Sequence, residues 1–206
     1  MRSKKIEKFI LETDKLEIID FVNNLDFEPD VVNKHINSVA SKLNGNSYMF
    51  DISKSDKSKE ISLYQSSNNL MSIEPTQKLI QIIDRISETL EISKDNVFLQ
   101  ILNQEAGGYI NPHYDTSIDG YITYKCNISV SSENYDLFID DDKININELD
   151  LYCFEASLYK HWTNPFKGKR IILSYGFILP YEDLGRSEND PRVRLSKRIF
   201  KYFQNK

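Results

Sequence analysis

The chain has 206 residues, of which 40% are hydrophobic and 12% aromatic, and this composition is that of a folded protein rather than a disordered one. Its net charge of −5 lacks the basic footprint of a general nucleic-acid binder, so we expect no nucleic-acid partner. No apolar run approaches the roughly 18 residues of a membrane span, and the apolar stretch near the N-terminus is too short for a signal peptide. We therefore expect a single-domain cytoplasmic protein with no membrane partner, and its oligomeric state stays open.

Helical patterns dominate residues 1–94, which we expect to form a mainly helical support. The apolar spacing predicts helices over residues 14–25, 29–45 and 74–93. In the first helix Leu16, Ile19 and Val22 share one face, and Asp14 is a candidate N-cap. The last helix carries the clearest apolar stripe, made of Leu79, Ile82, Ile83, Ile86 and Leu90.

Short runs rich in β-branched and aromatic residues follow. They predict strands over residues 96–102, 120–130, 135–140, 146–154, 157–162 and 169–179. Consecutive strands without intervening helices predict a β-sandwich or closed barrel over residues 95–182. Cys126 and Cys153 lie inside these apolar runs, so we expect two reduced, buried thiols. Residues 183–206 predict a C-terminal helix, with Asp190 as its N-cap.

The β-rich part holds a candidate metal site. It contains two of the three histidines, His113 and His161, and Asp115 stands two positions after the first of them. Side chains on a strand alternate, so His113 and Asp115 can face one point, and a neighbouring strand can bring His161 to it. Two imidazoles and one carboxylate form a facial triad that leaves coordination positions open and suits non-haem Fe(II).

A candidate anion anchor follows nine residues after His161, where Arg170 begins the apolar strand "RIILSYGF". An arginine pointing into a barrel is costly unless it meets an anion, and its fork is shaped for a carboxylate. Arg170, Ile172 and Ser174 share a face by alternation. If that face is the barrel interior, Arg170 and Ser174 are placed to hold a carboxylate.

From about residue 96 to 180 the sequence resembles the Fe(II)/2-oxoglutarate-dependent dioxygenases, and most closely their prolyl-4-hydroxylase-like branch. The resemblance rests on "FLQILNQEAGGYINPHYD", "CNISVSS" and "LDLYCFEASLYKHWTNPFKGKR". These segments hold a His-x-Asp pair, a distal histidine and, after it, Gly168-Lys169-Arg170. The resemblance implies a mainly β chain with N-terminal helices (α+β). Its core would be a double-stranded β-helix, a jelly-roll of cupin type, buttressed by those helices.

The resemblance also implies the cofactors and their ligands. His113, Asp115 and His161 would bind Fe(II), and Arg170 would pair with the distal carboxylate of 2-oxoglutarate. The family often places a tyrosine at the position of Gln104, which here would be the second contact to that carboxylate. Molecular oxygen would be the other co-substrate, with ascorbate as a candidate reductant.

The implied reaction is hydroxylation of an unactivated C–H bond, with release of succinate and carbon dioxide. An amino acid or other small metabolite is the favoured substrate, and a prolyl or other residue of a peptide is the alternative. Desaturation, cyclisation and epoxidation by the same oxidant stay open. Nucleic-acid demethylases of the superfamily typically carry a second arginine six residues after the first, where this chain has Gly176.

Two other classes of protein remain as alternatives: a non-catalytic cupin-like binding module and a hydrolytic zinc enzyme. Several aromatic residues near the metal motif are candidates either for lining a substrate pocket or for packing: Tyr109, Tyr114, Tyr124, Tyr159 and Trp162.

Overall fold

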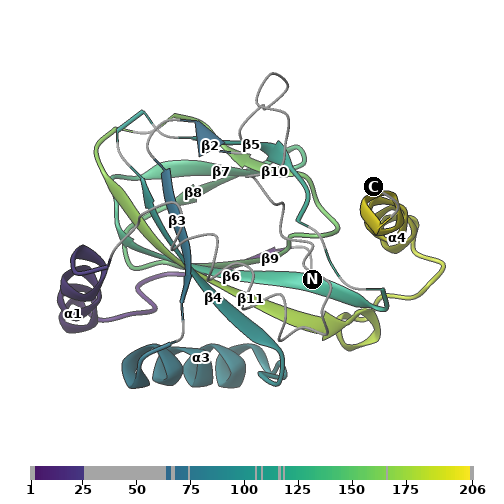
Figure 1. Ribbon diagram of the computed structural model, residues 1–206, viewed down its shortest axis with the longest axis horizontal. Coiled ribbons are helices and arrows are strands. Elements are labelled where there is room, and N and C mark those ends of the chain that lie inside the picture. The colour runs from purple at the N-terminus through teal and green to yellow at the C-terminus, as the bar shows by residue number, and fades with distance from the viewer. Residues whose placement is uncertain are drawn as a thin grey trace.

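The computed structural model of the chain describes residues 3–25, 64–65, 68–73, 75–104, 106–107, 109–115, 117, 119–165 and 167–204. The predicted helix over residues 29–45 lies outside these ranges. Two antiparallel sheets face each other, and Figure 1 shows the smaller sheet above the larger one with helix α3 below the larger sheet. Among the described helices, none has the length and apolar character needed to cross a membrane.

The larger sheet has six strands. Their order across the sheet is β1 (Ser3–Ile6), β9 (Leu151–Glu155), β6 (Tyr121–Ser131), β11 (Arg170–Pro180), β4 (Val97–Gln104) and β3 (Asn68–Ile73). The smaller sheet has five strands, in the order β2 (Tyr64–Gln65), β5 (Tyr109–His113), β10 (His161–Thr163), β7 (Tyr135–Ile139) and β8 (Asp142–Ile146). From β4 onward the chain passes back and forth between the two sheets, so neighbouring strands of one sheet are far apart in the chain. The predicted double-stranded β-helix is confirmed.

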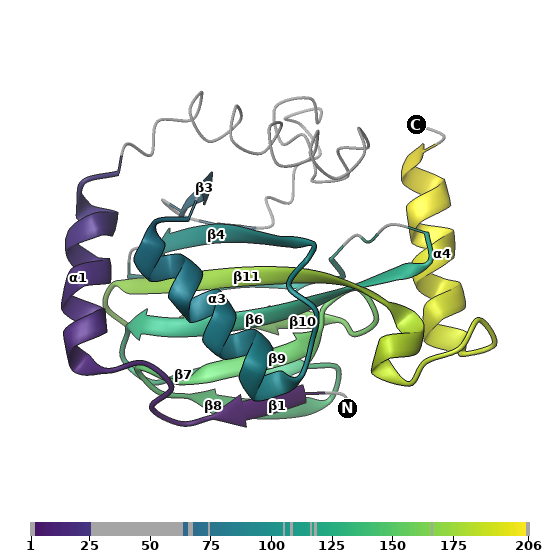
Figure 2. The same ribbon diagram turned by 90° about the horizontal axis from the view of Figure 1, so that it is seen from below.

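The helices surround the larger sheet. They are α1 (Glu12–Asn23), α3 (Gln77–Leu90), the short 3₁₀ helix η1 (Tyr181–Leu184) and α4 (Pro191–Gln204). Figure 2 shows α3 lying across the outer face of the larger sheet, with α1 and α4 at opposite ends of the molecule. The hydroxyl oxygen of Thr76 accepts a hydrogen bond from the Leu79 N–H (3.4 Å) and so caps α3.

The larger sheet has an apolar outer face and a more polar inner face. On the outer face the stripe of α3 packs against alternate residues of the central strands, and the buried side chains include Leu79, Ile86, Ile101, Leu173 and Phe177. Cys126 and Cys153 lie opposite each other on this face, both buried and free, as the sequence predicts. Because side chains alternate along a strand, the polar residues of these strands lie on the inner face and point toward the smaller sheet.

Within the described part of residues 1–94 the structure has three strands that the sequence does not predict, β1, β2 and β3. β1 has the sequence "SKKI" and pairs with β9 at the sheet edge. β3 has the sequence "NNLMSI" and pairs with β4. Lysine and asparagine are poor strand signals, but lysine is common on edge strands because it hinders pairing with another molecule.

Helix α1 also differs in detail from the prediction. It begins two residues before Asp14, so Asp14 is not the N-cap, and its carboxylate instead accepts from the backbone N–H of Leu11 (3.4 Å). The buried face contains Ile18 and Val22, whereas Leu16 is 68% exposed. The side of α1 that faces the core therefore carries Asp14, Ile18 and Val22, which are spaced four residues apart.

Candidate metal centre and co-substrate site

The three predicted metal ligands lie together. His113 ends β5 and His161 begins β10, and the two residues pair directly across the smaller sheet. Asp115 Oδ1 lies 3.2 Å from His113 Nε2 and 3.7 Å from His161 Nε2. One ligand atom from each of the three residues falls within 4.8 Å of the others. Strand alternation is not what joins His113 to Asp115, since β5 ends at His113 and Asp115 follows it in the connecting segment.

Backbone carbonyls orient two of these ligands. The backbone N–H of Asp115 donates to Ala156 O (3.0 Å), and His161 Nδ1 lies 3.0 Å from Tyr159 O. Because a carbonyl oxygen only accepts, Nδ1 carries the proton and Nε2 keeps its lone pair on the side of Asp115. The ring of Phe154 packs edge-on against the His161 ring, with centroids 4.8 Å apart. A metal ligand held in one tautomer and one orientation is the arrangement that metal sites require.

The charges of the site favour a bound cation. Burial, together with His113, lowers the pKa of His161 to about 3, so its imidazole is neutral at neutral pH. Burial alone would raise the pKa of the Asp115 carboxyl, but Lys125 and the two histidines outweigh this and hold it well below its usual range. Neutral imidazole and ionised carboxylate are the forms that bind a metal.

Lys125, on β6, is a component of the site that the sequence reasoning missed. Its ammonium donates to Gln100 Oε1 (2.8 Å) and to Ser174 Oγ (3.3 Å), and it lies 3.7 Å from Asp115 Oδ2. The two carboxylate oxygens of Asp115 thus have different neighbours, with Oδ1 toward the histidines and Oδ2 toward Lys125. Burial lowers the pKa of Lys125, and Asp115 acts in the opposite direction.

Gly176 explains how Lys125 fits inside the barrel. It is the residue of β11 that pairs with both Lys125 and Phe98. The Phe98 ring lies against Gly176, and a Cβ at this position would be only 2.1 Å from Cζ of Phe98. Only glycine therefore leaves room for the ring. The Lys125 ammonium then lies over that ring, 4.7 Å from its centroid. A lysine inside the apolar run "YITYKCNISV" is the sequence signal that could have indicated this arrangement.

Arg170 lies fully buried in a second polar cluster inside the barrel. It pairs in register with Gln104, and its Nε donates to Gln104 Oε1 (2.6 Å). Its Nη2 lies 3.4 Å from Thr163 Oγ1, and its guanidinium lies over the Tyr135 ring, 4.4 Å from the centroid. Groups from both sheets therefore hold the guanidinium in one position.

This second cluster fits an anionic ligand. Gln104 is 0% exposed, and its amide nitrogen makes no hydrogen bond within the part of the chain that the structure describes. A buried donor of this kind is costly unless it meets an acceptor, and a ligand carboxylate beside Arg170 would supply one. Tyr135, which the sequence reasoning missed, brings a tyrosine to Arg170 from the other sheet, and its hydroxyl donates to Tyr152 Oη (2.9 Å).

Ser174 lies in the metal-side cluster rather than beside Arg170. Ser174 is four positions after Arg170 on an extended strand, which corresponds to a distance of roughly 13 Å along β11. The contact that the structure shows for the Ser174 hydroxyl is with Lys125. The sequence correctly places Arg170 and Ser174 on one face, but their spacing along β11 assigns them to different clusters.

The aromatic candidates separate in a similar way. Tyr124 is 4% exposed and belongs to the apolar core between the larger sheet and the helices, so it does not line a pocket inside the barrel. Trp162 stacks on Phe138 of the neighbouring strand, with centroids 5.1 Å apart. The ring of Tyr159 packs under two arginines, Arg186 and Arg192.

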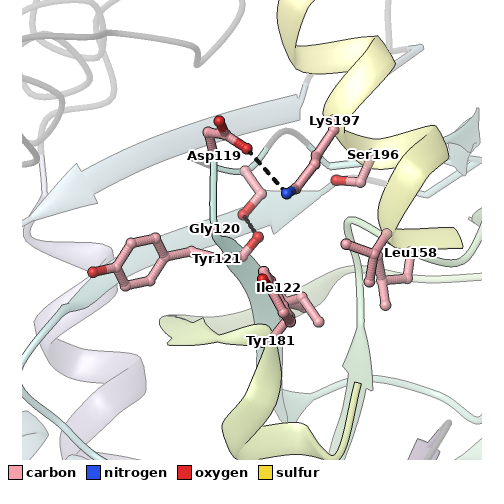
Figure 3. A pocket seen from close by; sticks show the side chains of 10 residues that line it. Asp119, Gly120, Tyr121, Ile122, Leu158, Tyr181, Ser196 and Lys197 are labelled. Carbon is pink, nitrogen blue, oxygen red and sulfur yellow. Dashed lines mark hydrogen bonds and ion pairs between the residues drawn. The ribbon is translucent and has the colours of Figure 1, made fainter. Parts of the chain in front are cut away.

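A separate pocket lies between α4 and the start of β6. Figure 3 shows Leu158 and Ser196 beside it, and Lys197 in an ion pair with Asp119 (3.7 Å). None of the three metal ligands is among its lining residues. This pocket belongs to the contact between α4 and the barrel, not to the metal site.

Comparison with solved structures agrees with the fold. The chain superposes on HygX from Streptomyces hygroscopicus, solved with nickel, 2-oxoglutarate and hygromycin B, with a TM-score of 0.56, 8% identity and coverage of 86% and 82% of the two chains. It superposes on a prolyl hydroxylase from Trichoplax adhaerens, bound to a hypoxia-inducible-factor peptide, with a TM-score of 0.53, 9% identity and coverage of 90% and 87%. The chain has the fold of the 2-oxoglutarate oxygenases.

A viral collagen prolyl hydroxylase from Paramecium Bursaria Chlorella virus-1 gives a TM-score of 0.51, 14% identity and coverage of 87% and 90%. No family model and no curated protein sequence matches the chain. The similarity to the oxygenase fold is therefore one of architecture, and the residues of this chain carry the argument about its chemistry.

Proposed function

We propose that the protein is an Fe(II)- and 2-oxoglutarate-dependent hydroxylase. The observation that carries the proposal is the cluster of His113, Asp115 and His161 inside a barrel that also buries Arg170. Two imidazoles and one ionised carboxylate match the donor set of non-haem Fe(II) oxygenases. A zinc hydrolase would use similar ligands but would leave the buried guanidinium without a role.

Each cluster has its own part in the proposed reaction. Bound Fe(II) and 2-oxoglutarate would supply the oxidising chemistry with molecular oxygen, and succinate and carbon dioxide would leave. His113, Asp115 and His161 would hold the metal, and Tyr159 O keeps His161 in the metal-binding tautomer. Arg170 would pair with the distal carboxylate of 2-oxoglutarate, and the amide N–H of Gln104 would donate to the same group.

We infer that the substrate is an amino acid or other small metabolite, with a prolyl residue of a peptide as the second candidate. The neighbours of this fold support both classes, since one was solved with hygromycin B and another with a peptide fragment. The net charge of −5 disfavours a nucleic acid. Hydroxylation is favoured over halogenation because Asp115 occupies the coordination position that a halide needs.

The test is succinate formation by the purified protein with Fe(II), 2-oxoglutarate and ascorbate, together with a mass-spectrometric screen for products heavier by one oxygen atom. His161→Ala should abolish succinate formation and should also abolish the visible charge-transfer band of the anaerobic Fe(II)–2-oxoglutarate complex. A protein that forms neither the band nor succinate would contradict the proposal and leave the cupin-like binding module and the zinc hydrolase as alternatives.

A further inference from the structure

One loop contacts two of the three metal ligands. Residues 156–160 form a turn between β9 and β10, where the sequence predicts a strand from residue 157 onward. Ala156 O accepts from the backbone N–H of Asp115 (3.0 Å), and Tyr159 O lies 3.0 Å from His161 Nδ1. The backbone position of Asp115 and the ring orientation of His161 therefore both depend on the conformation of this loop.

Arg192, in the first turn of α4, holds the loop from outside the barrel. Its Nη1 donates to Leu158 O (3.2 Å), and its guanidinium lies over the Tyr159 ring, 4.1 Å from the centroid. Its Nη2 also pairs with Asp140 Oδ2 (2.9 Å). Asp140 in turn accepts from the backbone N–H of Lys160 (3.1 Å). The Arg192 guanidinium therefore contacts the loop at Leu158 and at Tyr159, and is linked to Lys160 through Asp140.

Arg186 holds the same loop from the segment that precedes α4. Its guanidinium donates to both carboxylate oxygens of Glu155 (3.3 and 2.6 Å), and Glu155 is fully buried at the start of the loop. Its Nη2 also donates to the Tyr159 hydroxyl (2.9 Å). A third contact, to Asp190 Oδ2 (3.1 Å), links Arg186 to the N-terminus of α4. Such forked, charge-assisted contacts are the geometrically specific ones.

We propose that Arg186 and Arg192 are positioning residues of the metal centre. They fix the loop 156–160, and through that loop they position Asp115 and His161. The inference rests on the proposed function only in taking these residues as metal ligands. It gives the basic residues at the start of α4 an intramolecular role.

A comparison within α4 supports a local rather than a general effect. Lys197, further along the helix, is also a cation that pairs with acidic residues, Glu188 (2.8 Å) and Asp119 (3.7 Å). Neither of these partners belongs to the loop 156–160. Lys197 and Arg192 thus form a matched pair on one helix, in which only one member touches the loop.

The experiment is a titration of the metal-free protein with Co(II), followed by visible absorption, on the full chain. Arg192→Met keeps most of the side-chain length but removes the fork, and we expect it to weaken Co(II) affinity by about tenfold and to alter the Co(II) spectrum. Lys197→Met should leave both unchanged. Arg192→Lys keeps a cation over Tyr159 but cannot reach all three partners, and should lose only part of the affinity.

Thermal melting of each metal-free variant shows whether it is folded at the temperature of the titration. The proposal is overturned if folded Arg192→Met binds Co(II) as the unchanged protein does, or if Lys197→Met weakens binding equally. The proposed function survives either result, provided that the unchanged protein binds Co(II) and His161→Ala does not. An unchanged protein that binds no Co(II) would overturn both proposals.

Discussion

The two polar clusters inside the barrel are held in different ways. Arg170 and Gln104 are both 0% exposed and pair in register on neighbouring strands. At the metal end the side chains of His113 and Asp115 are 16% and 20% exposed, and a loop supplies the carbonyls that orient Asp115 and His161. Sheet pairing thus fixes Arg170, the proposed carboxylate anchor, while loop geometry positions Asp115 and His161 of the proposed metal site. Substitutions should therefore affect the two ends independently.

The largest expected effect is that of Asp115→Gly. It removes the only carboxylate of the triad and the negative charge that offsets part of the metal's charge. We expect loss of nearly all hydroxylation and most metal affinity. The metal-free variant should still fold, because Asp115 lies beyond the end of β5 and outside the apolar clusters, but its melting temperature should fall because buried Lys125 loses its carboxylate neighbour. Metal content after anaerobic reconstitution and a melting curve test this, and full metal content with full turnover would show that the triad is misassigned.

Arg170→Met should disturb the opposite end of the barrel. Charge-assisted hydrogen bonds contribute roughly 1.5–3 kcal/mol each, so loss of the fork should raise the 2-oxoglutarate requirement by at least about tenfold. Co(II) affinity should stay within about twofold, because Gln104 and Thr163 hold Arg170, whereas the carbonyl of Tyr159 orients His161. The measurement is the dependence of succinate formation on 2-oxoglutarate concentration. An unchanged requirement would place the carboxylate anchor elsewhere.

Lys125→Met should affect the metal end more mildly than Asp115→Gly. The lysine holds Asp115 Oδ2 and so leaves Oδ1 to face the histidines. Without it we expect Co(II) affinity to fall by about tenfold, the lower end of the range for residues that orient a metal ligand. Ser174→Ala is the matched control, since it removes one partner of Lys125 and leaves the lysine in place. Equal losses in the two variants would argue against a specific role for Lys125.

The sequence predicts the metal ligands and Arg170 because each belongs to a short local pattern. It does not predict Lys125 or Tyr135, whose importance depends on residues distant in the chain. Arg170, for example, meets Gln104 across 66 positions, and Lys125 meets Ser174 across 49. Such contacts depend on the register between strands, which long-range packing sets and local composition does not.

The same dependence on long-range packing explains why the sequence mispredicts some of the strands. β1 and β3 are stabilised mainly by backbone pairing with β9 and β4, so their polar sequences carry no alternation that would reveal them. The strand predicted over residues 157–162 begins only at His161, because the preceding residues form the turn that contacts Asp115 and His161. The apolar stripe of α3, by contrast, is a local and strongly periodic signal, and it is confirmed.

The smallest expected effect comes from the outer face of the larger sheet, where Asp14 joins α1 to α3 through Lys78 Nζ (2.5 Å) and Arg85 Nη2 (3.6 Å). Burial would raise the pKa of Asp14, but Lys78 and the Leu11 N–H outweigh it and lower the pKa. Asp14→Asn should therefore reduce the melting temperature at pH 7 by about 2–4 °C, the size typical of a modest loss in a chain of this length.

The pH dependence of this effect has a definite sign. Because the folded-state pKa of Asp14 lies below its unfolded value, the unfolded state takes up the proton first as the pH falls. The stabilising contribution is thus complete above the ordinary aspartate pKa and disappears as the pH falls through the lower, folded-state value.

The melting curves of Asp14→Asn and the unchanged protein should converge as the pH falls below about 4. Co(II) affinity and the 2-oxoglutarate requirement should not change in this variant, since Asp14 touches neither cluster inside the barrel. A difference in melting temperature that stayed constant down to low pH would mean that the carboxylate charge does not join the helices. A change in Co(II) affinity would mean that the metal end responds to packing on the outer face, and the independence of the two ends would then have to be abandoned.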